Sequence, residues 1–126
     1  MSCDLTPTGR ILIIDKEPSA VEALRLALVG TGFDAAVVAD PGAAEQSLRL
    51  LPPDLVLMDW NLPGVAEIEA LRRLRAACGA ERVAMIILSA RLAEADVVAA
   101  LNLGAEDCIG KPFSCREVIA RIEAVL

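Results

Sequence analysis

Short apolar runs alternate with longer segments of helical periodicity along the 126 residues of this chain. Continuous apolar runs are typical of parallel strands that are buried on both faces of a sheet, whereas half-exposed strands alternate apolar and polar residues. The alternation predicts an α/β fold, a (βα)5 doubly wound five-stranded parallel sheet, in a single domain over residues 1–126. The predicted strands are Ile11–Ile14, Ala35–Val38, Leu55–Met58, Val83–Leu88 and Cys108–Ile109.

The segments between these runs carry apolar residues at the spacing of one helix face. Asp40 before Pro41 predicts a helix start, and Ser114 with Glu117 forms a capping-box pattern. A fourth helix is expected from Asp96 to Leu103. Three glycines, Gly32, Gly79 and Gly104, stand where helices are predicted to end. The residues expected on the buried helix faces are Val21, Leu24, Ala27 and Leu28; Ile68, Leu71, Leu74 and Arg75; Val97, Val98 and Leu101; and Val118, Ile122 and Val125.

The composition excludes several classes of function. Eighteen acidic residues against 12 basic ones give a net charge of −6, which argues against direct binding of nucleic acid. The chain has no histidine, so Ser-His-Asp catalysis and histidine-ligated metals are excluded. The four cysteines form no CxxC pair, so reduced structural thiols are expected. The longest apolar stretch is too short to cross a membrane, and the beginning of the chain is unlike a signal peptide, so a soluble cytoplasmic protein is expected.

Polar residues follow the predicted strands directly, at the edge where open parallel sheets bind their ligands. No glycine-rich phosphate loop accompanies them, which argues against a nucleotide-binding or flavodoxin-like enzyme. Carboxylates, a small hydroxyl and an ammonium at one edge suit a covalent phosphoryl acceptor. The segments are Asp15-Lys16-Glu17, Asp59-Trp60-Asn61, Ser89-Ala90 and Gly110-Lys111-Pro112.

Four segments carry a resemblance to a known family: ILIIDKEPS, DLVLMDWNLPG, ILSAR and GAEDCIGKPFSCREVIARIEAVL. Over essentially its whole length the chain resembles a response-regulator receiver domain of the OmpR/PhoB type, whose receivers precede a DNA-binding domain. The resemblance, together with the right-handed crossover rule, implies a flavodoxin-like fold with strand order 2-1-3-4-5. It also implies that a DNA-binding output domain is absent or removed from this chain.

The resemblance assigns roles to individual residues. Asp59 corresponds to the phosphoacceptor, Ser89 to the switch hydroxyl, and Lys111 to the cation that contacts the phosphoryl oxygens. The bond between Lys111 and Pro112 is expected to be cis. Asp15, Asp59 and the backbone carbonyl of Asn61 correspond to the Mg²⁺ ligands. No conventional enzyme activity is implied, only self-catalysed phosphoryl transfer to Asp59 from a histidine kinase, a phosphotransfer protein or a small phosphodonor.

Lys16 departs from the family pattern, because it stands where the principal Mg²⁺-binding carboxylate is expected. An ammonium is not a ligand for Mg²⁺, and the change alters the local charge by two units. Weak Mg²⁺ binding is therefore expected, with Lys16 occupying part of the metal's volume and pairing with Asp59 or Asp15. A phosphorylation-independent pseudo-receiver, which acts through protein–protein contacts of the last two helices, is the alternative function.

Two further departures concern the signalling surface. Cys108 replaces the aromatic residue that usually reports phosphorylation, and Glu67 replaces a glycine after the Leu-Pro-Gly turn. Asp107 and Arg121 resemble one ion pair of the family's charged dimer face, whereas Glu117 is left without an obvious partner. A weak homodimer through the face of Asp107, Glu117 and Arg121 is therefore expected.

Overall fold

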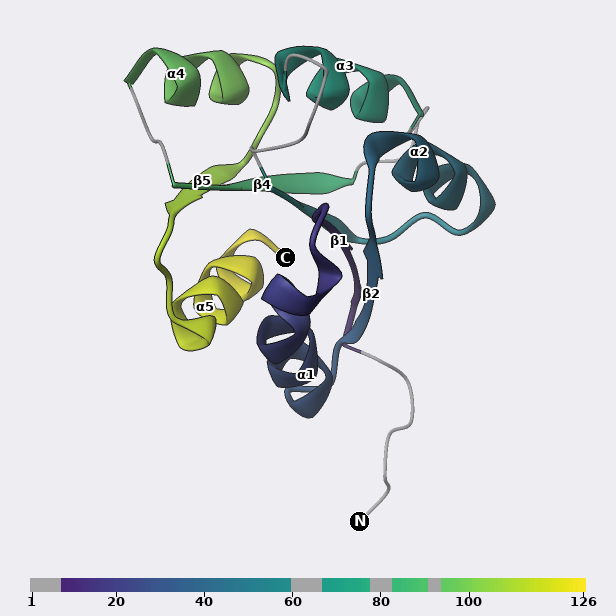
Figure 1. Ribbon diagram of the computed structural model, residues 1–126, viewed down its shortest axis with the longest axis vertical. Helices are drawn as coiled ribbons and strands as arrows, with labels where there is room; N and C mark the ends of the chain where they lie inside the picture. Colours follow the sequence, from purple (N-terminus) through teal and green to yellow (C-terminus); the bar gives the residue numbers. More distant parts are fainter. Residues whose placement is uncertain (1–7, 60–66, 78–82, 91–93) are drawn as a thin grey trace.

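The computed structural model describes residues 8–59, 67–77, 83–90 and 94–126. Within these ranges five parallel strands form one sheet in the order β2-β1-β3-β4-β5. The predicted α/β fold and strand order are confirmed (Figure 1). The strands are β1 (Arg10–Ile14), β2 (Asp34–Val38), β3 (Leu55–Asp59), β4 (Ala84–Ser89) and β5 (Asp107–Gly110).

Helices cover both faces of the sheet, with α2, α3 and α4 on one side and α1 and α5 on the other (Figure 1). A short 3-10 helix, η1, which the apolar pattern did not predict, precedes α1. Among the described residues no helix is long and apolar enough to cross a membrane. The helices are η1 (Pro18–Val21), α1 (Glu22–Gly30), α2 (Pro41–Leu50), α3 (Glu67–Ala77), α4 (Glu94–Asn102) and α5 (Cys115–Val125).

Successive residues of each strand point to opposite faces, so each strand contributes to two hydrophobic clusters. The first cluster lies under α2, α3 and α4 and takes Leu12, Ile14, Val56, Met58, Met85 and Ile87 from the strands. The second lies under α1 and α5 and takes Ile11, Ile13, Leu55, Leu57, Ile86 and Leu88. Burial on both faces explains why the strands read as continuous apolar runs.

The predicted helix caps are present. The Asp40 carboxylate accepts a hydrogen bond from the backbone N–H of Ala43 at 2.8 Å, and the Ser114 hydroxyl accepts one from the N–H of Glu117 at 3.0 Å. Gly32 and Gly104 follow helix ends with φ of 103° and 102°, a conformation that favours glycine. Gly79, the third predicted helix end, lies outside the described residues.

The expected bounds and buried face of the fourth helix are wrong. The helix runs from Glu94 to Asn102, and Val98 and Leu101 are 48% and 46% exposed. The small side chain of Ala100 is buried in their place and belongs to the cluster under α3 and α4. Residues 97–101 of α4 are all apolar, so helical spacing does not select one buried face among them. The packing of α4 on the sheet decides which of these residues are covered.

Candidate functional site

The strand register brings three polar strand ends to one edge of the sheet. Asp59, the last residue of β3, pairs with Leu88, so Ser89 lies one residue further along β4. Ser89 in turn pairs with Gly110, and the backbone N–H of Lys111 donates to the Ser89 carbonyl at 2.8 Å. Asp59 and Ser89 are the last residues of β3 and β4, whereas the sequence predicted that they follow these strands. The hydrogen-bonded pairing of the strands continues one residue beyond the apolar run.

Asp59 and Lys111 form an ion pair at this edge. The Nζ of Lys111 donates to Oδ1 of Asp59 at 3.0 Å. The Asp59 side chain is only 5% exposed, whereas that of Lys111 is 28% exposed, so water still reaches the ammonium. The predicted cis bond between Lys111 and Pro112 is present at the end of β5. The structure thus places the expected acceptor carboxylate and the expected cation in direct contact.

Asp15 follows β1 and is buried beside Asp59. Its backbone N–H donates to the carbonyl of Val38 at 3.0 Å, and its Oδ1 accepts the backbone N–H of Glu17 at 2.9 Å. Burial raises the pKa of Asp15; the Glu17 hydrogen bond opposes the rise, and the charge of Asp59 adds to it. Two carboxylates therefore share this edge with one ammonium, that of Lys111.

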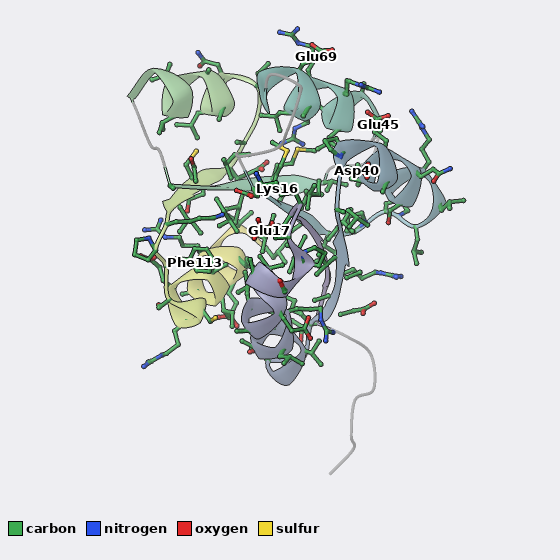
Figure 2. All side chains as sticks on the ribbon, viewed as in Figure 1. Lys16, Glu17, Asp40, Glu45, Glu69 and Phe113 are labelled. Carbon is green, nitrogen blue, oxygen red and sulfur yellow. The ribbon has the colours of Figure 1, made fainter. Side chains whose placement is uncertain are left out.

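Lys16 is exposed, and it forms no ion pair among the described residues. Figure 2 shows Lys16 and Glu17 after β1, between the α3–α4 layer and the α1–α5 layer. The expected pairing of Lys16 with Asp59 or Asp15 is not seen; Lys111 is the cation that contacts Asp59. Lys111 follows Gly110, which pairs with Ser89, and its backbone N–H donates to the Ser89 carbonyl at 2.8 Å, so its side chain begins at the same sheet edge as Asp59.

Asp15 and Asp59 fit a divalent cation only in part. They offer hard carboxylate oxygens, as Mg²⁺ requires, but Asp59 is already paired with Lys111. No three histidine, cysteine, aspartate or glutamate side chains of the described residues are placed to hold a metal together. Asn61, whose carbonyl is the third expected ligand, and Trp60 lie outside the described ranges.

The charged face on β5 and α5 differs from expectation in one respect. Arg121 contacts Asp107 at 3.0 Å, as expected, but it also contacts Glu117 at 3.7 Å, one helical turn earlier. Glu117 therefore has a partner, and that expectation is wrong, because residues four apart meet on one helix face. Cys108 is half-buried on β5, and burial and then the charge of Asp107 raise the pKa of its thiol.

The sequence matches the family described as response regulator receiver domain over residues 11–123. The chain belongs to the response regulator receiver domain family. This receiver domain is 44% identical over 121 residues to the DNA-binding response regulator MtrA of Mycolicibacterium smegmatis, covering 96% of the chain and 52% of that protein. It is 39% identical over 117 residues to the phosphate regulon transcriptional regulatory protein PhoB of Rhizobium meliloti, covering 93% and 52%. The receiver domain thus spans about half the length of these relatives.

One similar solved structure is the receiver domain of sensor histidine kinase PA1611 from Pseudomonas aeruginosa PAO1. That structure has a magnesium ion coordinated in its active site cleft. It is 28% identical to this receiver domain, has a TM-score of 0.79, and the match covers 92% of this chain and 95% of that one. The TM-score shows that the two chains share an overall fold.

Sequence reasoning missed the role of Arg75, which it placed on the apolar face of the third helix. The structure shows its guanidinium donating to the carbonyls of Val83 and Gly104 and pairing with Glu106. An arginine at an apolar position of a helical pattern, in the last turn of the helix, was the signal available in the sequence.

Proposed function

We propose that this receiver domain accepts a phosphoryl group on Asp59. The proposal rests on the contact of 3.0 Å between the buried Asp59 carboxylate and the Lys111 ammonium. Ser89, the last residue of β4, lies at the same edge of the sheet. A carboxylate nucleophile, a cation for the transferred oxygens and a hydroxyl donor are the groups that phosphoryl transfer to a protein needs.

The donor is the phosphohistidine of a histidine kinase or phosphotransfer protein, or a small phosphodonor. A carboxylate oxygen of Asp59 forms a bond to phosphorus while the bond to the donor nitrogen breaks. The nitrogen leaves with the electron pair and takes up a proton from solvent, so the donor histidine ends as a neutral imidazole. Lys111, which is partly exposed and able to turn, then contacts the phosphoryl oxygens, and the Ser89 hydroxyl donates a hydrogen bond to one of them.

Mg²⁺ supplies charge neutralisation at such sites when it is bound. Asp15, Asp59 and the backbone carbonyl of Asn61 would hold it in this chain. The magnesium ion in the active site cleft of the similar PA1611 receiver supports a metal at this kind of site. Lys16 stands in place of the remaining carboxylate. Because Mg²⁺ binds oxygen ligands and an ammonium offers none, this replacement lowers the affinity for Mg²⁺. We therefore propose that Mg²⁺ binds this receiver weakly.

Phosphorylation is tested by incubating the wild type and Asp59→Asn with acetyl phosphate and measuring the intact mass. The wild type is expected to gain one acid-labile, hydroxylamine-sensitive phosphoryl group, and Asp59→Asn none. Asp54→Asn, at an exposed aspartate before β3, is the matched control and should be labelled like the wild type. Label on Asp59→Asn would refute the assignment of Asp59. A wild type that stays unlabelled at saturating Mg²⁺ would instead favour the phosphorylation-independent pseudo-receiver.

The role of Lys16 is tested by titrating Mg²⁺ and following Trp60, the single tryptophan and the neighbour of Asp59 in the sequence. Lys16→Asp restores a carboxylate, and Lys16→Gln removes the charge without adding a ligand. Because Lys16 is exposed, its charge is screened, and a gain of at least about tenfold in Mg²⁺ affinity, or about 1.4 kcal/mol, is expected for Lys16→Asp. Equal titrations of all three proteins would place Lys16 outside the metal's influence.

The relatives also suggest the partners of the whole protein. We infer that the chain acts in the cytoplasm with a histidine kinase and a fused DNA-binding output domain. The matched relatives are a DNA-binding response regulator, MtrA, and a transcriptional regulatory protein, PhoB, each about twice this length. A weak homodimer would use the face of Asp107, Glu117 and Arg121. Sedimentation of the wild type and Arg121→Glu, with and without acetyl phosphate, tests it. A dimer that survives Arg121→Glu would exclude this face.

A further inference from the structure

We propose that Lys16 is a second phosphoryl-binding cation, which contacts the oxygens of a phosphoryl group on Asp59 from the β1 side while Lys111 contacts them from the β5 side. The inference rests on the proposed function, because it names the side chain that neutralises the transferred group where the Mg²⁺ site is incomplete. Asp59 is then able to accept a phosphoryl group when divalent metals are absent.

The sheet places the two lysines on opposite sides of Asp59, the last residue of β3. β1 is the neighbour of β3 on one side, and Lys16 is the second residue after β1. β4 and then β5 lie on the other side, and Lys111 is the first residue after β5. Because the strands are parallel, both lysines follow their strands at the same edge, and Figure 2 shows Lys16 there, between the two helical layers.

Lys16 is available to an anion that arrives from solvent. It is exposed, and its ammonium makes no ion pair or hydrogen bond within the part of the chain that the structure describes. A lysine carries its charge on a flexible stem with rotatable donors, so it can turn toward the sheet edge without a backbone movement. The Asp59 side chain is only 5% exposed and its surroundings are packed, so a phosphoryl group on it must project toward solvent, where Lys16 lies.

The charge of the acceptor site favours a second cation. Transfer converts the Asp59 carboxylate, which has one negative charge, into an acyl phosphate with about two at neutral pH. Lys111, which contacts Asp59 at 3.0 Å, offsets about half of that charge, and Asp15 is buried beside the same carboxylate. The ammonium of Lys16 supplies the remaining positive charge, and its hydrogen bonds to phosphoryl oxygens are of the strong, charge-assisted kind.

The transfer step balances without a metal when acetyl phosphate is the donor. A carboxylate oxygen of Asp59 forms a bond to phosphorus while the bond between phosphorus and the acetate oxygen breaks. Acetate leaves with the electron pair. Lys16 and Lys111 donate hydrogen bonds to the phosphoryl oxygens, and neither lysine forms or breaks a covalent bond.

Labelling by acetyl phosphate in a buffer with divalent metals chelated tests this role. Lys16→Gln is expected to slow labelling by about tenfold or more, because a charged contact to the transferred group is lost. Lys16→Arg keeps the charge and the donors, so its rate should stay within about threefold of the wild type. Arg49→Gln, at an exposed arginine in the last turn of α2, is the matched control and should label like the wild type.

The contact itself can be observed because Lys16 and Lys111 are the only two lysines of the chain. In protein that carries isotope-labelled lysine, their side-chain methylene groups next to the ammonium give one NMR signal each, and Lys16→Arg assigns them. Metal-free phosphorylation of the wild type is expected to shift both signals, and acetyl phosphate should shift neither in Asp59→Asn. A shift of the Lys111 signal alone would overturn the inference.

The outcomes of the labelling experiment separate this inference from the proposed function. Equal metal-free rates for the wild type and Lys16→Gln would overturn the role of Lys16 and leave Asp59 as the acceptor. A wild type that is labelled only when Mg²⁺ is present would do the same. A wild type that stays unlabelled both with and without Mg²⁺ would overturn the proposed function, and this inference with it.

Discussion

Replacing Lys111 with methionine removes the ammonium that contacts Asp59 and keeps an apolar stem of similar length. The Asp59 carboxylate then stays buried at the strand edge next to Asp15 and has lost the ammonium that contacts it at 3.0 Å. Because removing one partner of a buried ion pair is costly, this single change is expected to destabilise the folded chain. The size of the effect measures how strongly the buried Asp59 carboxylate depends on Lys111 for its stability.

The structure sets the size of this effect. At 3.0 Å and an effective dielectric of about 20, two unit charges attract by about 5 kcal/mol. The Lys111 side chain is 28% exposed, so water weakens this attraction and replaces part of it once the ammonium is gone. Loss of one partner of a buried pair costs about 3–5 kcal/mol, and the remaining exposure lowers the expectation for Lys111→Met to about 2–4 kcal/mol.

A double-mutant cycle separates the pair from other effects of the methionine. Asp59→Asn removes the carboxylate and also its repulsion of Asp15, so it should change stability little on its own. Lys111→Met in the Asp59→Asn background should then cost less than about 1 kcal/mol, which leaves a coupling energy of about 2 kcal/mol. Urea unfolding of all four proteins, with divalent metals chelated, gives these values.

Lys16→Met is the matched control, since Lys16 and Lys111 are the only two lysines of the chain. Lys16 is exposed and has no ion pair among the described residues, so its replacement should change stability by less than about 0.5 kcal/mol. If Lys111→Met costs the same with and without Asp59→Asn, the contact contributes nothing and the reasoning is refuted.

Three further predictions concern stability. Leu57→Ala, at a fully buried position of β3, should cost about 2–5 kcal/mol in urea unfolding, whereas Leu50→Ala at an exposed one should cost less than about 0.5 kcal/mol; equal costs would contradict the core described here. Burial raises the pKa of Asp15 above 3.8, so the folded chain binds this proton more tightly than the unfolded chain, and stability falls as pH rises from 3.8 through the raised pKa. Asp15→Asn should remove that fall and unfold at higher urea near neutral pH with metals chelated; a lower midpoint than the wild type would count against it. Ser114→Ala should cost about 1 kcal/mol by removing the cap of α5, and an unchanged midpoint would mean that the cap contributes nothing.

Local and repetitive properties of the sequence were sufficient to predict the α/β fold class, whereas the strand order was predicted from the family resemblance and the crossover rule. Each strand is buried on both faces, so its apolar run is visible without any partner, and caps such as Asp40 and Ser114 act within one turn of their own helix. The strand ends Asp59, Ser89 and Lys111 could be placed at one edge because parallel strands share a direction. The proposed roles of these residues came from the resemblance to a known family, because the order of the strands alone does not say what each side chain does.

Tertiary structure decided the features that depend on which groups meet across the fold. The partner of Asp59 is Lys111 and not Lys16, because a side chain's direction after a strand end depends on the loop that follows it. Val98 and Leu101 are exposed because the orientation of α4 is set by its packing, to which a helical repeat is indifferent. Arg75 reaches carbonyls 8 and 29 residues away in the chain. The sequence by itself determined which segments form strands and helices, because burial repeats with the period of each element. Only the tertiary structure decided the contacts between distant segments, because no local pattern of residues specifies them.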